Sequence, residues 1–242
     1  MTDRRTALVT GANKGIGLAI AKGLAAAGHD VWIGCRDRDR GEAAVAELGR
    51  EGVAVRLLPL DVTSDDSVKQ AAASLAQQTG RLDVLVNNAG IAGRADLTPT
   101  QQPVDDIKAV YEVNVFGPMR TTQAFLPLLK ASDRPRVVMM SSGLGSIANN
   151  SNPEWPAYAT NLAGYNTSKT ALNGITVTLA KELGPLGFKV NAACPGYVAT
   201  DLNGHKGPRT TEQGAVIAVR LATLGPDGPN GGFFNEDGPL PW

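Results

Sequence analysis

Residues 10–17 most constrain the fold of this chain, with the sequence Thr-Gly-Ala-Asn-Lys-Gly-Ile-Gly. They join an apolar run to an Ala-rich amphipathic segment, an order that predicts a strand, a tight turn and a helix start. Glycines let the backbone approach a pyrophosphate, and the free N–H groups of a helix N-terminus favour an anion. The spacing departs from the common G-x-G-x-x-G fingerprint, so a plain glycine turn remains an alternative to a phosphate site.

The strand–helix alternation continues along the chain. The apolar run at 31–35 has no polar alternation, which is typical of a strand buried on both faces of a parallel sheet. Strands are predicted at 7–9, 31–35, 53–58, 82–86, 137–140, 188–193 and 233–234. Helices are predicted at 18–27, 41–49, from 64, 104–130, 165–183 and 211–224, with Thr63 and Asp66 as a capping box. This order predicts one α/β domain over residues 1–242, a Rossmann-type, doubly wound, seven-stranded parallel sheet flanked by helices on both faces.

Composition restricts the partners. The 23 basic and 23 acidic residues cancel, so nothing indicates a surface for nucleic acid or an anionic membrane. No run approaches the length of a membrane span, and no apolar signal core precedes the first strand. Cys35 and Cys194 have no metal-ligand spacing, so no metal site is expected. We therefore expect a soluble, cytoplasmic protein that acts on a small molecule.

Ligands of such sheets bind beyond the carboxyl ends of the strands, so the residues there are the candidates. Arg36 follows the second strand, where a carboxylate would favour NAD and a cation would favour a 2′-phosphate. With Lys14 in the glycine turn, Arg36 indicates NADP(H), and Arg40 is a second candidate. A solvated charged turn is the alternative. Asp61, after the third strand, can accept a hydrogen bond from an adenine amino group or merely cap its loop.

Tyr165 and Lys169 are spaced i, i+4, so both project from one face of the helix predicted there. An ammonium beside a phenol lowers the phenol pKa by stabilising phenolate. The pair is therefore expected to perform general acid–base catalysis near neutral pH. The alternative is an exposed surface pair with no catalytic role. The position of the pair beyond a strand of a ligand-binding sheet favours catalysis.

Four motifs in this order resemble the short-chain dehydrogenase/reductase family, carbonyl reductases in particular, from residue 7 to about 242. They are Thr-Gly-x-x-x-Gly-Ile-Gly at 10–17, Asp61-Val62, Asn87-Asn88-Ala89-Gly90 and Tyr165-Asn166-Thr167-Ser168-Lys169. In this family the tyrosine exchanges a proton with the substrate oxygen and the lysine also grips the nicotinamide ribose. A serine hydrogen-bonds the carbonyl, and an asparagine helps to hold a water relay. The resemblance places these roles on Tyr165, Lys169, Ser142 and Asn114.

The resemblance also implies a set of NADP(H)-binding residues. A Pro-Gly segment after the sixth strand lies beside the nicotinamide in the family, since proline fixes the turn and glycine permits close approach. The expected set is Gly11, Asn13, Lys14, Gly15, Ile16, Gly17, Arg36, Arg40, Asp61, Val62, Asn88, Ala89, Gly90, Tyr165, Lys169, Pro195, Gly196, Val198 and Thr200.

Two departures from the family pattern concern the substrate. Tyr165 follows Ser142 by 23 positions, more than is usual in the family, and residues 149–164 are expected to form a loop insertion near the active site. Residues 200–210 form only a short substrate loop where many members fold a helical lid. Trp155 and Tyr197 are candidate walls for a substrate that Ser142 binds, with simple packing as the alternative. Monomeric carbonyl reductases carry similar extra residues, so a monomer or a small homo-oligomer is expected.

The function predicted from these residues is NADPH-dependent reduction of ketones or aldehydes to alcohols. An acyl or polyketide ketoreductase and an NAD-linked alcohol dehydrogenase are alternatives within the family. A non-catalytic NADP(H) sensor is the alternative outside enzymes, although a sensor would not need the proton donor.

Overall fold

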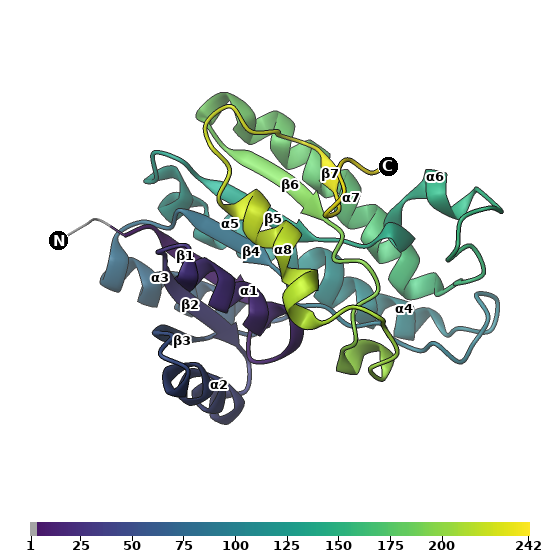
Figure 1. Cartoon of the computed structure of the whole chain (residues 1–242), viewed down its shortest axis with the longest axis horizontal. Coiled ribbons are helices and arrows are strands. Elements are labelled where there is room, and N and C mark those ends of the chain that lie inside the picture. The colour runs from purple at the N-terminus through teal and green to yellow at the C-terminus, as the bar shows by residue number, and fades with distance from the viewer. Residues whose placement is uncertain (1–3) are drawn as a thin grey trace.

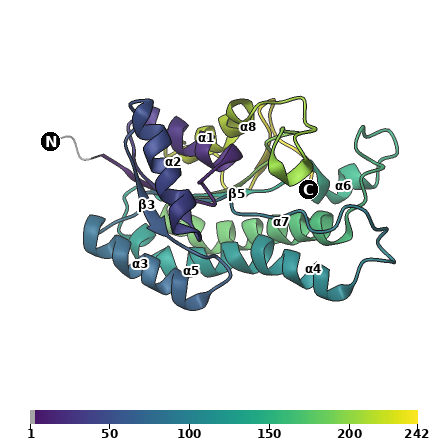
Figure 2. The same ribbon diagram turned by 90° about the horizontal axis from the view of Figure 1, so that it is seen from below.

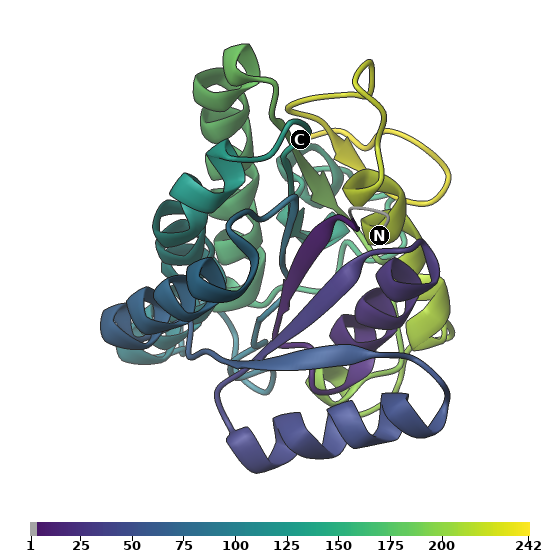
Figure 3. The ribbon, with the colours of Figure 1, turned by 90° about the vertical axis from the view of Figure 1, so that its left-hand side faces the viewer.

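The computed structural model describes residues 4–242 and contains one seven-stranded sheet with the order β3-β2-β1-β4-β5-β6-β7 (Figure 1). Every neighbouring pair of strands runs parallel. The strands are β1 (Thr6–Thr10), β2 (Asp30–Cys35), β3 (Val55–Pro59), β4 (Val84–Asn87), β5 (Arg136–Met140), β6 (Lys189–Ala193) and β7 (Phe233–Phe234). The predicted Rossmann-type sheet is confirmed. Figure 3 shows its twist, with β3 and α2 at one edge and the yellow C-terminal segment at the other.

Helices cover both faces of the sheet (Figure 2). One layer holds α1 (Gly15–Ala26), α2 (Arg38–Arg50) and α8 (Thr211–Ala222), and the other holds α3 (Asp65–Thr79), α4 (Val104–Tyr111), α5 (Gly117–Lys130) and α7 (Ala163–Leu183). A short helix, α6 (Ile147–Asn150), lies in the insertion before α7.

Alternation along the strands divides the buried apolar side chains into two cores. In β1, Ala7 and Val9 pack against α1 and α8, whereas Leu8 belongs to the core beneath α3, α5 and α7. Each fully buried leucine or phenylalanine stabilises the fold by roughly 1.5–3 kcal/mol relative to exposure. This two-sided burial explains why the strands read as continuous apolar runs, and it leaves the strand ends as the place for polar chemistry.

The predicted helical region 104–130 is confirmed, although it is not uniform, and the predicted cap of the third helix is wrong. The region 104–130 is not one regular helix, because a π-helical turn, η1 (Glu112–Phe116), separates α4 from α5. Helix α3 is capped by Ser64, whose Oγ accepts a hydrogen bond from the backbone N–H of Ser67 at 3.2 Å. Thr63 instead donates through its N–H and its hydroxyl to Asp61. A short turn back to its own loop therefore competes successfully with helix capping.

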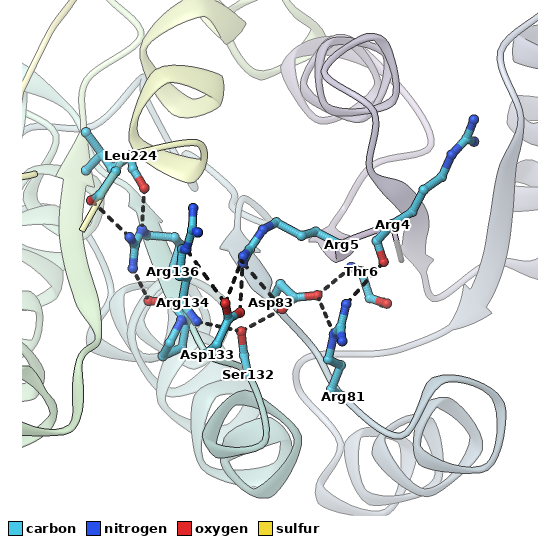
Figure 4. Close-up of polar contacts among 12 residues, drawn as sticks. Arg4, Arg5, Thr6, Arg81, Asp83, Ser132, Asp133, Arg134, Arg136 and Leu224 are labelled. Carbon is cyan, nitrogen blue, oxygen red and sulfur yellow. Dashed lines mark hydrogen bonds and ion pairs between the residues drawn. The ribbon is translucent and has the colours of Figure 1, made fainter. Parts of the chain in front are cut away.

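A polar network ties the amino ends of the central strands together (Figure 4). The fully buried Asp83 carboxylate accepts from the Thr6 N–H at 2.7 Å, the Ser132 hydroxyl at 2.6 Å and the Arg81 Nε at 3.2 Å. Nearby, the buried Arg136 guanidinium donates to the carbonyl oxygens of Leu224 and Gly225 beyond α8. These contacts satisfy polar groups that water cannot reach, and they hold the end of the sheet opposite the site.

Replacing Asp83 with alanine should lower the free energy of unfolding by about 3 kcal/mol, because buried donors lose their common acceptor. Urea denaturation measures this change. Asp133→Ala is the control, since that exposed carboxylate pairs with Arg5 at 3.1 Å in solvent, where such a pair contributes about 1 kcal/mol or less. Equal losses in the two variants would contradict the buried role.

Candidate active site

A cavity of about 940 Å³ opens at the carboxyl ends of the strands. Most residues predicted to hold a dinucleotide line it: Gly11, Asn13, Lys14, Gly15, Ile16, Gly17, Arg36, Arg40, Asp61, Val62, Asn88, Ala89, Gly90, Tyr165, Lys169, Pro195 and Thr200. Gly196, Val198, Asn114, Ser142, Trp155 and Tyr197 lie outside its lining. Within residues 4–242, no cluster of three or more His, Cys, Asp or Glu side chains is placed to hold a metal ion.

The glycine turn between β1 and α1 fits a pyrophosphate. Gly11 has a φ of +62°, and a Cβ there would lie 2.9 Å from the Cα of Ala89. A Cβ at Gly17 would collide with the side chain of Asn88, whose Nδ2 donates to the Thr10 carbonyl oxygen at 2.9 Å. Helix α1 has neither a side-chain cap nor an acidic residue in its first turn. Its terminal N–H groups are therefore left for an anion, so these residues fit a dinucleotide.

The cations predicted to recognise a 2′-phosphate differ in their surroundings. Arg36 is exposed and has no hydrogen bond or ion pair to any residue from 4 to 242. Arg40 Nε lies 3.3 Å from the Asp37 carboxylate, and Lys14 Nζ lies 2.5 Å from Oδ2 of Asp201. Arg36 is thus the cation most open to a phosphate. Sequence reasoning missed Asp201, because its partner lies far away along the chain.

One of the two carboxylate oxygens of Asp61 accepts hydrogen bonds from its own loop. Its Oδ1 accepts from the N–H and the hydroxyl of Thr63 at 2.9 and 2.7 Å. Its other carboxylate oxygen has no hydrogen-bond partner in the described part of the chain and remains able to accept from an adenine amino group. Both sequence interpretations of Asp61, as a loop cap and as a ligand, are therefore compatible with its geometry.

Helix α7 carries Tyr165 and Lys169 on one face, and burial changes the pKa of both. Lys169 Nζ donates to the Met140 carbonyl oxygen at 2.7 Å and lies 5.5 Å from the centroid of the Tyr165 ring. Burial lowers the pKa of Lys169 to about 8. Burial also raises the pKa of Tyr165 to about 12, although a hydrogen bond with Ser142 acts in the opposite direction. The expectation that Lys169 lowers the tyrosine pKa is wrong here, because burial dominates and the ammonium faces a carbonyl.

Asn114 lies in the π-helical turn and joins three segments of the site. Its Oδ1 accepts from the Ile91 N–H at 2.9 Å, and its Nδ2 donates to the Ile91 carbonyl at 2.9 Å and to Ser168 Oγ at 3.0 Å. Ser168 in turn donates to the Tyr165 carbonyl at 2.7 Å. The π-helical turn thus places a fully buried amide where it fixes both the loop beyond β4 and the first turns of α7.

Hydrogen bonds to Asn173 of α7 fix the turn that carries Ser142. Ser141 Oγ donates to Asn173 Oδ1 at 2.6 Å, and Asn173 Nδ2 donates to the Gly145 carbonyl at 3.2 Å. Asn173 follows Lys169 by four residues, so it lies on the same helix face. Sequence reasoning missed it, although this i+4 spacing is a signal that could have identified it.

The segment 149–164, predicted to be a loop insertion, is hydrogen-bonded to the turn after Ser142. Asn150 Nδ2 donates to the Leu144 carbonyl at 2.8 Å, and Asn166 of α7 donates to the Asn150 side chain at 3.3 Å. The Trp155 ring packs on Gly143, where a Cβ would lie 3.2 Å from the ring. Trp155 therefore contacts the residue that follows Ser142. Tyr197 is 55% exposed and lies away from the cavity lining.

The family model for short chain dehydrogenases matches residues 5–211. The chain belongs to the short-chain dehydrogenase/reductase family. It is an oxidoreductase of this family, which uses nicotinamide cofactors. No helix within residues 4–242 is long and apolar enough to cross a membrane.

Individual relatives cover almost the whole chain. It is 36% identical to (+)-neomenthol dehydrogenase of Arabidopsis thaliana over 96% of each protein. It is 32% identical to carbonyl reductase (NADPH) 1 of Mus musculus, with 100% of this chain and 99% of the relative covered. The structure of an NADPH-bound carbonyl reductase from chicken fatty liver matches with a TM-score of 0.86 and 30% identity, over 99% of both chains. The mouse alignment spans 283 positions, more than the 242 residues of this chain, so the mouse protein carries insertions relative to it.

One more residue of this reductase-family site was invisible in the sequence. Helix α7 has no side-chain cap at Leu162, but the buried Gln102 accepts from the Gly164 N–H through Oε1 at 3.2 Å. Gly164 directly precedes Tyr165. The Nε2 of Gln102 is buried without a hydrogen-bond partner within residues 4–242, an unfavourable state that the remainder of its packing must offset. Gln102 therefore caps the tyrosine helix from a distant loop.

Substituting Gln102 with leucine should increase amide hydrogen exchange in residues 163–168 roughly fivefold, because the Gly164 N–H loses an acceptor contributing about 1 kcal/mol. Mass spectrometry of the corresponding peptide measures this. Gln102→Glu keeps an acceptor oxygen and should retain the protection. Gln101→Leu, in which an exposed neighbour is changed, is the control. Unchanged exchange in Gln102→Leu would contradict the capping role.

Proposed function

We propose that this protein is an NADPH-dependent carbonyl reductase that converts ketones or aldehydes to alcohols. When bound, NADPH would supply the hydride to the carbonyl carbon, and the protein supplies the proton to the oxygen. The observation that carries this proposal is the placement of Tyr165 beside Ser142 and Lys169 at the rim of a cavity that fits a dinucleotide.

Each polar side chain has a distinct role in the proposal. Tyr165 donates its phenolic proton to the substrate oxygen as negative charge develops there. Ser142 hydrogen-bonds the same oxygen and orients it toward the phenol. Lys169, which lines the cavity and donates to the Met140 carbonyl oxygen, is the residue to hold the nicotinamide ribose. Asn114 positions the helix through Ser168.

The protonation state of Tyr165 at neutral pH is the one that a proton donor needs. A phenol with a pKa of about 12 is protonated at neutral pH, as a proton donor must be. Oxidation of an alcohol would need phenolate as the base, which this environment disfavours.

The choice of NADPH is supported by the unpaired guanidinium of Arg36 at the cavity edge. Two relatives named above are described with NADPH, the mouse carbonyl reductase and the chicken enzyme. Asp61, Gly196 and Val198 remain proposed contacts, and Trp155 and Tyr197 remain proposed substrate walls. The single domain over 1–242, the short substrate loop over 200–210, the cytoplasmic location and the monomeric or small oligomeric state stay predictions.

Replacing Tyr165 with phenylalanine should reduce NADPH oxidation with a reactive diketone about 100-fold or more, because the proton donor is lost. The fall in cofactor absorbance measures the rate, and fluorescence titration checks that the variant still binds NADPH. Tyr158→Phe is the matched control, since Tyr158 is an exposed tyrosine in the insertion. A wild-type protein that binds NADPH but reduces no member of a broad carbonyl panel would instead favour the sensor function.

The Arg36→Asp variant should lose NADPH use far more than NADH use, because a carboxylate repels the 2′-phosphate and can accept from ribose hydroxyls. The ratio of kcat/KM for the two cofactors measures the effect. Arg38→Asp introduces the same charge change two residues away, outside the cavity lining, and should leave the ratio nearly unchanged. An unaltered ratio in Arg36→Asp would refute the cofactor assignment.

A further inference from the structure

An ion pair joins two segments of the cavity wall that are remote in sequence. Lys14 lies at the N-cap of α1 within the glycine turn, and Asp201 begins the short 3-10 turn η4 (Asp201–Asn203) in the 200–210 loop. Lys14 Nζ and Asp201 Oδ2 are 2.5 Å apart, and both residues line the cavity. The pair therefore bridges the proposed 2′-phosphate region and the substrate loop.

The conformation of the 200–210 loop places a second basic side chain beside the Asp201 carboxylate. The other oxygen of Asp201 lies 2.7 Å from Nε2 of His205. Within residues 4–242, His205 is the one residue other than glycine with a positive φ, at 60°, a conformation that costs roughly 1–2 kcal/mol for an L-residue. Its backbone N–H also donates to the Thr200 carbonyl at 2.9 Å. The turn thus places two basic side chains on one exposed carboxylate.

The same turn lies against the glycine turn. A Cβ at Gly15 would be 3.8 Å from Cγ2 of Thr200, an ordinary packing distance. Thr200 is in turn followed directly by Asp201, so the backbone holds the carboxylate close to Lys14. The residue that precedes Asp201 therefore lies near the glycine turn.

This arrangement affects phosphorylated and unphosphorylated dinucleotides differently. A 2′-phosphate carries a charge of about −1.5 to −2 near pH 7, and its cation must come from the cavity wall. Asp201 already compensates part of the Lys14 charge, so a phosphate at Lys14 would lie beside a carboxylate that attracts the same cation. NADH lacks the 2′-phosphate and therefore does not need Lys14 as a counter-charge.

We propose that Asp201 is a specificity-determining residue, which competes with the 2′-phosphate of NADPH for Lys14. This inference rests on the proposed NADPH dependence of the site. By holding Lys14, Asp201 weakens the preference for NADPH over NADH that Lys14 and Arg36 would otherwise give.

A double-mutant cycle on cofactor binding tests the competition without requiring turnover. Dissociation constants for NADPH and NADH are measured by calorimetry at low ionic strength for wild type, Asp201→Asn, Lys14→Met and the double variant. Asp201→Asn should tighten NADPH binding roughly two- to fivefold, the range that the loss of an exposed ion pair allows, and change NADH binding less. In the Lys14→Met background, Asp201→Asn should no longer alter the NADPH-to-NADH ratio.

Asp37→Asn is the matched control. It makes the same charge change in a residue that lines the same cavity, but Asp37 pairs with Arg40, and asparagine can still cap α2. Its effect on the affinity ratio should be the same with Lys14 and with Met at position 14. A general effect of cavity charge would give Asp37→Asn and Asp201→Asn the same behaviour and would overturn the proposal.

The remaining outcomes separate this inference from the proposed function. If Lys14→Met lowers the NADPH preference but Asp201→Asn weakens NADPH binding or shifts both cofactors equally, Asp201 does not compete and only this inference fails. If neither Lys14→Met nor Arg36→Asp changes the ratio of dissociation constants, the cofactor assignment itself fails and the inference falls with it.

Discussion

Burial of the Lys169 ammonium is the constraint on which the site depends. The residue is 5% exposed, and its Nζ is held by the carbonyl oxygen at the end of β5. The backbone on its other side is tightly packed, since a Cβ at Gly145 would lie 2.7 Å from the Lys169 backbone. Burial of a charged group is costly, and the pKa of Lys169 therefore falls to about 8. The neighbouring Tyr165 phenol, whose pKa is raised, is protonated at neutral pH.

The rest of the site keeps this pair in position. Asn114 ties α7 to the loop beyond β4, Asn173 supports the turn before Gly145, and Gln102 caps the first turn of α7. Each acts through a buried amide that can donate and accept at once, which suits the joining of segments without adding net charge. The catalytic geometry proposed for Tyr165 is therefore a property of three packed segments and not of one helix.

The sheet, the glycine turn and the residues at strand ends could be predicted from the sequence. Strands buried on two faces appear as apolar runs and tight turns appear as glycines, and both patterns involve residues that are neighbours in the chain. The resemblance to the family supplied Asn114 and Ser142, which the residues alone did not identify. Asp201 and Gln102 were not predicted, because their partners, Lys14 and Gly164, are far from them in the sequence. The pKa direction of Tyr165 was missed because the spacing to Lys169 reveals the neighbouring charge but not the depth of burial, and burial decides the sign.

The most direct test of this arrangement is a titration of Lys169 itself, by ¹³C NMR of the lysine Cε resonances, with Lys169→Met to assign the signal. We predict that the Lys169 resonance titrates near pH 8 while exposed lysines titrate near their usual value of about 10.4. A Lys169 resonance that titrates with the exposed lysines would show that the ammonium is well solvated. It would remove the physical basis for a protonated tyrosine and a buried cation acting together.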